Sequence, residues 1–298
     1  MIVGDSYNHL TFFFAQAFYK NAATFSAQQP LAPGMIAVLG RLGIPFNIST
    51  NASVCASPNL LANGTCSAQT LPWPTTLSDL NLTVSWPGSP PNGVAAPIYA
   101  TNSGYGAIYF QVPGAAPTSG TANFIVTQAS TGAVLGVGQF QMTKTDPGFF
   151  TTSANGLGAV AALNFHGATY YGVNSSSNPV ARGDTVALYL TGEGQVVGGP
   201  PPDGAAPTSG LTTATLPLVY IDALPSTVTY SGLGGGYPGL WQVNVTVPSV
   251  GPLPNQANSI VLTYLGVQSN IGGNSNAALD GTPGPDVKPI STTIWIGN

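Results

Sequence analysis

Charged side chains are scarce in this chain of 298 residues: five are Lys or Arg and nine are Asp or Glu. They make up 5% of the sequence, whereas soluble domains average about 25%. Five cations cannot build the basic face that neutralises nucleic-acid phosphates, so we expect no nucleic-acid partner. With one Glu, three Lys and two Arg, the chain also has few strong helix formers, which argues against a long helical protein.

Residues for catalysis and metal binding are equally few. His9 and His166 lie near no Gly-x-Ser-x-Gly nucleophile motif. A zinc site is not expected either, because the two Cys that would join the two His are expected to be oxidised. The acidic residues are scattered, and most adjoin Gly or Pro in expected turns. We expect Glu193 to be an exposed turn residue. The sequence therefore predicts no enzyme, no cofactor and no metal site.

The Cys content and the chain ends bear on the cellular compartment. No apolar run reaches about 18 residues, so we expect no membrane span. Cys55 and Cys66 lie in a loop-like stretch, and a local disulfide between them would indicate an oxidising compartment; the alternative is two free thiols. No signal peptide is visible at the start, and we expect one to have been removed, which places the protein outside the cell or on its surface. Six Asn-x-Ser/Thr triplets are weak evidence for glycans: they begin at Asn47, Asn51, Asn63, Asn81, Asn174 and Asn244.

Alternating apolar and polar residues between turns rich in Gly and Pro are the dominant pattern. The chain holds 38 Gly and 27 Pro, and both residues interrupt helices. The alternation is clearest at residues 107–112, 184–191 and 240–247. Further strands are expected at 35–39, 80–86, 122–127, 134–142, 217–222, 226–230, 259–265 and 290–296. Short strands at this spacing predict an all-β protein built of β-sandwiches.

An internal repeat predicts two copies of one sandwich. Residues 32–40 are echoed by 181–189, residues 108–113 by 242–248, and residues 124–127 by 260–263. In the second of these echoes, Pro113 and Pro248 each close a strand, because Pro cannot donate to the ladder. The repeat divides the chain into an extension at 1–20, one sandwich at 21–147 and a second at 148–298.

Several short motifs resemble those of a known family. They are Asn21 to Phe25, Leu31 to Gly34, Phe110 to Pro113, Pro147 to Phe150, Arg182 to Asp184, Leu190 to Gly194, Tyr230 to Leu233, Gly239 to Pro248 and Gln268 to Asn270. Together they resemble the tandem Ig-like (IPT/TIG-like) module at the C-terminal end of large secreted proteins of acidobacterial type. The resemblance implies two tandem Ig-like β-sandwiches in an extracellular, noncatalytic module. The chain departs from that pattern at 1–20, 47–72 and 271–289.

The N-terminal extension is rich in aromatic residues. As a strand it would present Leu10, Phe12, Phe14 and Phe18 on one face; residues 10–18 also allow an apolar helical stripe, and the β surroundings favour the strand. Burying these side chains stabilises by about 10 kcal/mol in total before entropy costs. Burial within the same chain and β-strand addition to a neighbouring subunit are both open.

Two functions of different kind follow. The first is an extracellular structural protein, a subunit that self-assembles head to tail into a surface filament or pilus-like fibre with the extension as donor strand. The scarcity of charge favours it, because charged residues normally protect free sheet edges. The alternative is a secreted or surface-attached module that binds polysaccharide or protein. Aromatic side chains that could contact a sugar are Trp73, Trp86, Tyr105, Tyr237 and Trp295.

Overall fold

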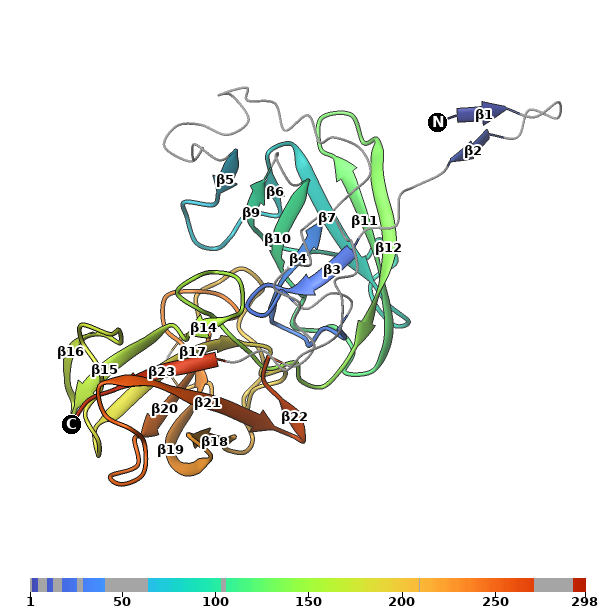
Figure 1. Cartoon of the computed structure of the whole chain (residues 1–298). Coiled ribbons are helices and arrows are strands. Elements are labelled where there is room, and N and C mark those ends of the chain that lie inside the picture. The colour runs from blue at the N-terminus through green and yellow to red at the C-terminus, as the bar shows by residue number, and fades with distance from the viewer. Residues whose placement is uncertain are drawn as a thin grey trace.

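The structure, a computed structural model, describes residues 2–4, 10–12, 18–25, 29–40, 64–102, 106–208, 210–270 and 292–298. These residues form strands and turns without any helix (Figure 1), so the all-β prediction is confirmed. Within these ranges no helix has the length and apolarity needed to cross a bilayer. The strands are β1 (Ile2–Gly4), β2 (Leu10–Phe12), β3 (Phe18–Asn21), β4 (Ile36–Gly40), β5 (Thr65–Ser67), β6 (Thr76–Leu77), β7 (Leu80–Ser85), β8 (Val94–Ala95), β9 (Ile98–Asn102), β10 (Ala107–Gln111), β11 (Gly120–Gln128), β12 (Val134–Met142), β13 (Gly148–Phe149), β14 (Gly158–Ala159), β15 (Ala162–His166), β16 (Thr169–Val173), β17 (Thr185–Thr191), β18 (Leu218–Ile221), β19 (Leu224–Leu233), β20 (Trp241–Thr246), β21 (Gln256–Tyr264), β22 (Val267–Gln268) and β23 (Thr292–Ile296).

Two sheets enclose the hydrophobic core of the first half. One sheet has the strand order β3-β4-β10-β9-β5, and the other has the order β12-β11-β7-β6 with β8 beside β7. Alternate residues of each strand point inward, as along β7, where every second side chain is buried. The layers meet where Phe110 of β10 stacks on Phe140 of β12, with ring centroids 5.7 Å apart. This face-to-face packing is typical of a β-sandwich.

The strands of the second half form one sheet that folds back over its own core. Its order is β14-β23-β21-β18-β19-β20-β17-β15-β16, with β13 beside β17 and β22 beside β21. The long strand β19 pairs with β18 at one end and with β20 at the other, so it connects two layers. Trp241 of β20 is fully buried between them, and its ring centroid lies 5.3 Å from that of Tyr264 of β21.

The strand pairings of the two halves repeat one another. The echoed segments β4 and β10 pair antiparallel in the first half, as β17 and β20 do in the second. Leu31 forms a parallel bridge to β12, and Val180 forms the equivalent bridge to β23. Gly34 and Gly183, at matching positions of the echo, each donate a backbone hydrogen bond to the residue before the strand-closing Pro, Val112 and Val247 respectively. The sequence repeat therefore corresponds to a repeat of hydrogen bonding.

Hydrogen bonds join the two halves closely. The hydroxyl of Thr191 accepts from the Ile36 amide at 2.8 Å and donates to the Gly239 carbonyl at 2.8 Å. Gly192, at φ +91°, lies so close to the connecting segment that an added Cβ would stand 1.9 Å from the carbonyl oxygen of Asp146. The glycine therefore permits both the backbone conformation and the close approach.

Candidate functional site

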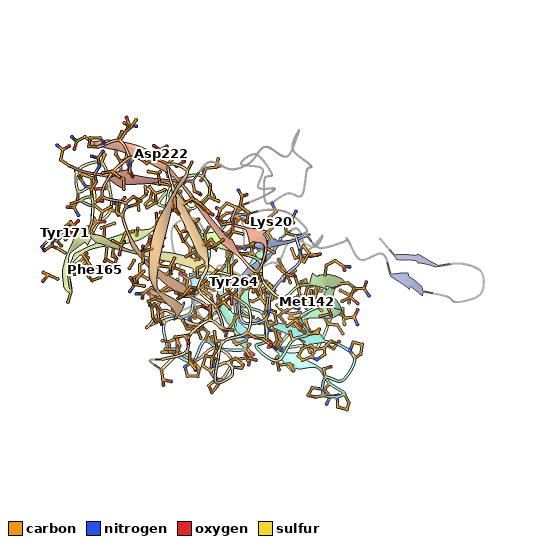
Figure 2. The ribbon with its side chains drawn as sticks, turned by 90° about the horizontal axis from the view of Figure 1, so that it is seen from below. Lys20, Met142, Phe165, Tyr171, Asp222 and Tyr264 are labelled. Carbon is orange, nitrogen blue, oxygen red and sulfur yellow. The ribbon has the colours of Figure 1, made fainter. Side chains whose placement is uncertain are left out.

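The predicted assembly strand is divided between two parts of the structure. Leu10 and Phe12 belong to β2, which pairs antiparallel with β1 as a hairpin. In two views this hairpin stands apart from both cores (Figures 1 and 2). Phe18 begins β3, whose partner is β4 of the first sheet, so the boundary drawn after residue 20 falls inside a strand. Phe14 lies outside the described residues, and donation to a neighbouring subunit stays a prediction.

Apolar side chains are exposed on a terminal strand of the second half. β16 is last in its sheet order, and Tyr170 and Val173 on it are 53% and 51% exposed. No charged residue interrupts β16. In both views β16 and the N-terminal hairpin lie at opposite ends of the molecule, and Tyr171 of β16 is labelled in the second (Figures 1 and 2).

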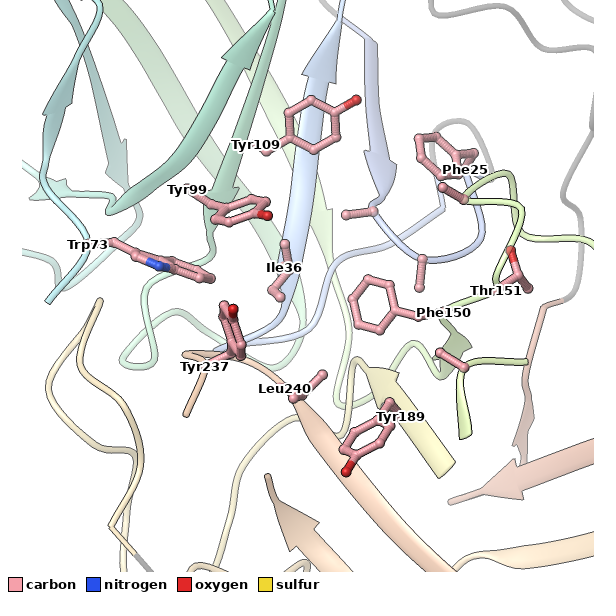
Figure 3. A pocket seen from close by; sticks show the side chains of 14 residues that line it. Phe25, Ile36, Trp73, Tyr99, Tyr109, Phe150, Thr151, Tyr189, Tyr237 and Leu240 are labelled. Carbon is pink, nitrogen blue, oxygen red and sulfur yellow. The ribbon is translucent and has the colours of Figure 1, made fainter. Parts of the chain in front are cut away.

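An aromatic hollow of about 540 Å³ lies where the two halves meet. Figure 3 shows rings from both halves around one space, with Trp73, Tyr99 and Tyr237 on one side and Phe150 on the other. None of the described residues that line it carries a charge. The lining residues are Ala22, Ala23, Phe25, Ile36, Trp73, Tyr99, Tyr109, Phe150, Thr151, Ala154, Ala161, Tyr189, Tyr237 and Leu240.

Strand alternation explains why these rings meet at the hollow. Tyr109 lies between Ile108 and Phe110, which point into the first core, so its own ring points out of that core. Tyr189 has the same position between Leu188 and Leu190 in the second half. The outward faces of β10 in the first half and of β17 in the second half therefore both border the junction.

Trp73, Tyr99 and Tyr237 form the aromatic wall of the hollow. Trp73 is 5% exposed, and its ring centroid lies 5.1 Å from that of Tyr99 at a tilt of 41°. Burial raises the pKa of the Tyr99 hydroxyl, and the nearby Tyr237 hydroxyl raises it further. Tyr237 is 56% exposed. Each of these two hydroxyls can donate one hydrogen bond.

A second, more polar hollow adjoins this wall. It measures about 390 Å³ and shares Trp73, Tyr99 and Tyr237 with the first hollow. Its other lining residues include hydroxyl and amide side chains: Ser67, Gln69 and Thr70. The wall therefore has an apolar hollow on one side and hydrogen-bonding groups on the other.

Two of the aromatic residues named from sequence meet in this wall. Trp73 and Tyr237 are 164 positions apart in the sequence and line both hollows. Trp86 packs against the first core, and Trp295 lies in β23; Tyr105 is outside the described residues. The sequence analysis missed Tyr99, Tyr109, Phe150 and Tyr189, although the outward aromatic between two inward residues was a readable signal in β10 and β17.

The prediction that Glu193 is exposed is wrong. The side chain is 2% exposed, between Gly34 and Gln111 of the first half and Gly239 of the second. Burial raises its pKa to about 8, although backbone amides of Glu193 and Gly192 favour the charged form. The atom Oε2 has no hydrogen-bond partner among the described residues. Glu193 follows the end of β17, as expected from the sequence, but the opposite half covers it.

Asp146 is a second carboxyl at the junction. Burial raises the pKa of its carboxyl to about 7. The side-chain amide of Asn21 donates to Oδ2 at 3.0 Å and opposes this rise, because the hydrogen bond favours the charged form. The same amide also donates to the backbone carbonyl of Asp146 at 2.9 Å. Asn21 thereby ties the first strand of the first half to the connecting segment.

His166, Tyr171 and Asp184 form a cluster of polar contacts on the surface of the second half. Nδ1 of His166 lies 2.7 Å from Oδ1 of Asp184, and the Tyr171 hydroxyl donates to Oδ2 of Asp184 at 3.1 Å. All three side chains hold β16 against the turn before β17. In the described ranges, no three His, Cys, Asp or Glu side chains gather closely enough to hold a metal ion.

The disulfide and glycan predictions have different outcomes. Cys66 is buried in β5, while Cys55 lies outside the described residues, so their pairing stays a prediction. Asn174 is 1% exposed and exchanges two hydrogen bonds with the backbone of Trp295, at 2.8 and 2.9 Å. This position cannot carry a glycan without breaking the contact to β23. Asn81 and Asn244 are partly exposed, and Asn47, Asn51 and Asn63 lie outside the described residues.

Comparisons with known proteins identify no family for this chain. No family model and no curated protein match its sequence. The function is therefore inferred from the residues and geometry described above.

Proposed function

We propose that this chain is an extracellular structural protein of two tandem Ig-like β-sandwiches, the subunit of a surface filament or pilus-like fibre. The N-terminal hairpin β1–β2 carries the proposal. Within the described part of the chain its strands pair only with each other, and an isolated two-stranded hairpin is at best marginally stable in water. Pairing with another subunit would satisfy the free edges of the hairpin and cover the apolar segment that follows it.

The opposite end of the molecule supplies an acceptor. β16 ends its sheet, has no charged residue and exposes Tyr170 and Val173. A donor at one end and an acceptor at the other make a heterologous contact, which generates a filament when it does not close into a ring. Adding a strand to β16 would form backbone hydrogen bonds along its outer edge, in place of those that the Asn178 side chain now donates to the carbonyls of Tyr171 and Val173.

The repeated pairings of the two halves support the tandem Ig-like architecture. The resemblance of residues 21–298 to the IPT/TIG-like module supports a location outside the cell and a role without catalysis. Two strands named for assembly, β2 and β16, lie outside the motifs that carry this resemblance. The filament proposal thus depends on features particular to this chain.

Negative-stain images and sedimentation of the full chain test the proposal. We expect fibres, and we expect monomers when residues 1–12 are deleted, because that deletion removes β1 and β2 but keeps β3 in its sheet. Val173→Lys should also give monomers, because a charge on an edge strand opposes pairing. Leu218→Lys, a similarly exposed site on β18 inside its sheet, is the control and should keep fibres. A full chain that remains monomeric refutes the filament, and fibres from the deleted chain refute the hairpin as donor.

A secreted or surface-attached binding module is the second candidate. The aromatic hollow between the halves favours it, because ligand pockets occur preferentially at domain interfaces and are mostly apolar with a few polar groups. Its volume of about 540 Å³ lies in the range of about 300–1,000 Å³ that is usual for such pockets. A binding hollow and filament assembly are compatible in one subunit.

A further inference from the structure

The aromatic wall between the two hollows offers stacking surface without charge. Trp73 and Tyr99 pack against each other, and Tyr237 borders the same space from the second half (Figure 3). More than half of Tyr237 is exposed. Its ring is therefore accessible to a ligand and is not fully buried between the halves. A large exposed aromatic residue beside a hollow is a surface for a ligand with a flat apolar face.

The wall also presents hydrogen-bonding groups that the described residues leave unused. Among the described residues, the hydroxyls of Tyr99 and Tyr237 have no hydrogen-bond partner, although the two lie near each other. Ser67, Gln69 and Thr70 line the adjoining hollow. Hydroxyl and amide groups both donate and accept, so they match ligand hydroxyls in either role.

These properties together select one class of ligand. With no charged side chain in either hollow, a charged ligand would lose hydration without gaining a partner. A purely apolar ligand would suit the first hollow but would leave the polar groups of the second unpaired. A pyranose ring has an apolar face of C–H groups that stacks on aromatic rings, and a periphery of neutral hydroxyls that bond to Tyr, Gln, Ser and Thr.

We propose that the wall formed by Trp73, Tyr99 and Tyr237 binds a neutral oligosaccharide, with one ring stacked on Tyr237 and neighbouring rings in the two hollows. This inference deepens the second candidate function and does not depend on filament assembly. An oligosaccharide suits the site better than a single sugar, because the two hollows lie on either side of the same three rings. Tyr109 and Tyr189 also line the first hollow and would contact its occupant.

Titration calorimetry of the full chain tests the site. The probes are neutral hexasaccharides of β-glucan, xylan, mannan and α-glucan type, and a sulfated hexasaccharide is the charged comparison. We expect at least one neutral probe to bind and the sulfated probe to bind more weakly. Tyr237→Ala should weaken binding about tenfold, since loss of one aromatic contact of about 0.5–1.5 kcal/mol approaches the 1.4 kcal/mol of a tenfold change. Tyr99→Phe, which removes only a hydroxyl, should weaken it by about fivefold.

The control is Tyr220→Ala, an exposed tyrosine of β18 that lines neither hollow. It should bind as the unaltered chain does, and thermal unfolding of every variant shows whether the fold is retained. Failure of all neutral probes at millimolar concentration overturns the proposal. Binding that Tyr237→Ala leaves unchanged, or a preference for the sulfated probe, also overturns it. The filament is tested separately by imaging, so either proposal can fail while the other stands.

Discussion

Replacement of the buried Glu193 by Gln should stabilise the protein at neutral and alkaline pH. Burial raises the pKa of this carboxyl to about 8, from an ordinary value of 4.5. The folded chain therefore retains the proton at pH values where the unfolded chain has lost it. The free energy of unfolding falls as the pH rises from about 4.5 to 8 and then levels off, because only the folded state still holds the proton in that window. A glutamine side chain cannot ionise, so this contribution is absent from the variant.

The size of the effect follows from the interval between the two pKa values. Each pH unit above 4.5 costs about 1.4 kcal/mol of stability, up to the folded pKa. At pH 7 the loss amounts to about 3 kcal/mol, as an upper estimate. The amide of Gln matches the size of the carboxyl, and its oxygen can accept from the same backbone amides, those of residues 192 and 193. A hollow of about 20 Å³ beside Glu193 has room for one water molecule, which can accept a hydrogen bond from either the acid or the amide.

Urea unfolding at pH 5 and pH 8, followed by tryptophan fluorescence, measures the difference. At pH 5 the two proteins should be nearly equal, and at pH 8 Glu193→Gln should be more stable by several kcal/mol. Asp146, whose pKa is raised to about 7, weakens the fold in the same direction, but it is present in both proteins and cancels in the comparison. Curves that run parallel from pH 5 to pH 8 would refute the reasoning, because they would mean that Glu193 is ionised in the fold at neutral pH.

Two further substitutions test the junction and the second core. Gly192→Ala should destabilise the fold by about 3 kcal/mol or more, since its Cβ would stand 1.9 Å from the Asp146 carbonyl oxygen and φ is positive. The control Gly199→Ala, also at positive φ but with nothing near its Cβ, should cost only about 1 kcal/mol. Equal losses of stability in urea unfolding would contradict the close approach at Gly192. Asn174→Ala should cost about 2 kcal/mol, because it leaves the Trp295 amide without the Asn174 acceptor and removes one of two hydrogen bonds to the Trp295 carbonyl, which also accepts from Val180. A change below about 0.5 kcal/mol in thermal unfolding would show that β23 is held without Asn174.

Local pattern predicted the central strands of both halves. β17, β20, β10 and β7 each alternate between a core and a more polar face, and the structure has strands at all four expected places. β16 was not predicted, because Tyr170, Tyr171 and Val173 are all exposed. Its sequence therefore lacks the alternation of apolar and polar residues that marks a strand with one buried face. β9 was missed because its last three residues are all buried, two of them Thr101 and Asn102. Thr101 bonds to Ser78 and Asn102 bonds to Thr65, all within the first half. Buried polar residues paired in this way do not follow the alternation rule.

The aromatic hollow and the buried carboxyl could not be predicted in the same way. The rings of the hollow come from segments as distant as Phe25 and Tyr237, and only the docking of the halves brings them together. Glu193 follows a strand in a Gly-rich turn, which in a single sandwich would face water. The repeat predicted two similar halves, but it contains no information on which turn of one half covers which strand of the other.

The few charged residues of the chain also affect the stability of the junction between the halves. Of the 14 charged residues in the sequence, Glu193 is buried where the halves meet, and Asp146 lies in the segment that connects them. A carboxylate buried without full compensation destabilises a fold. These two carboxyls therefore lower the stability of the folded chain, an effect that exposed strands without buried carboxyls do not have. The raised pKa values of both carboxyls keep that cost low in acid, and the cost grows as the pH rises to about 7 for Asp146 and to about 8 for Glu193. A subunit of this kind should therefore hold its halves together most firmly in mildly acidic surroundings, while the uncharged β16 and the hollow lined by Tyr237 have no buried carboxyl of their own to titrate.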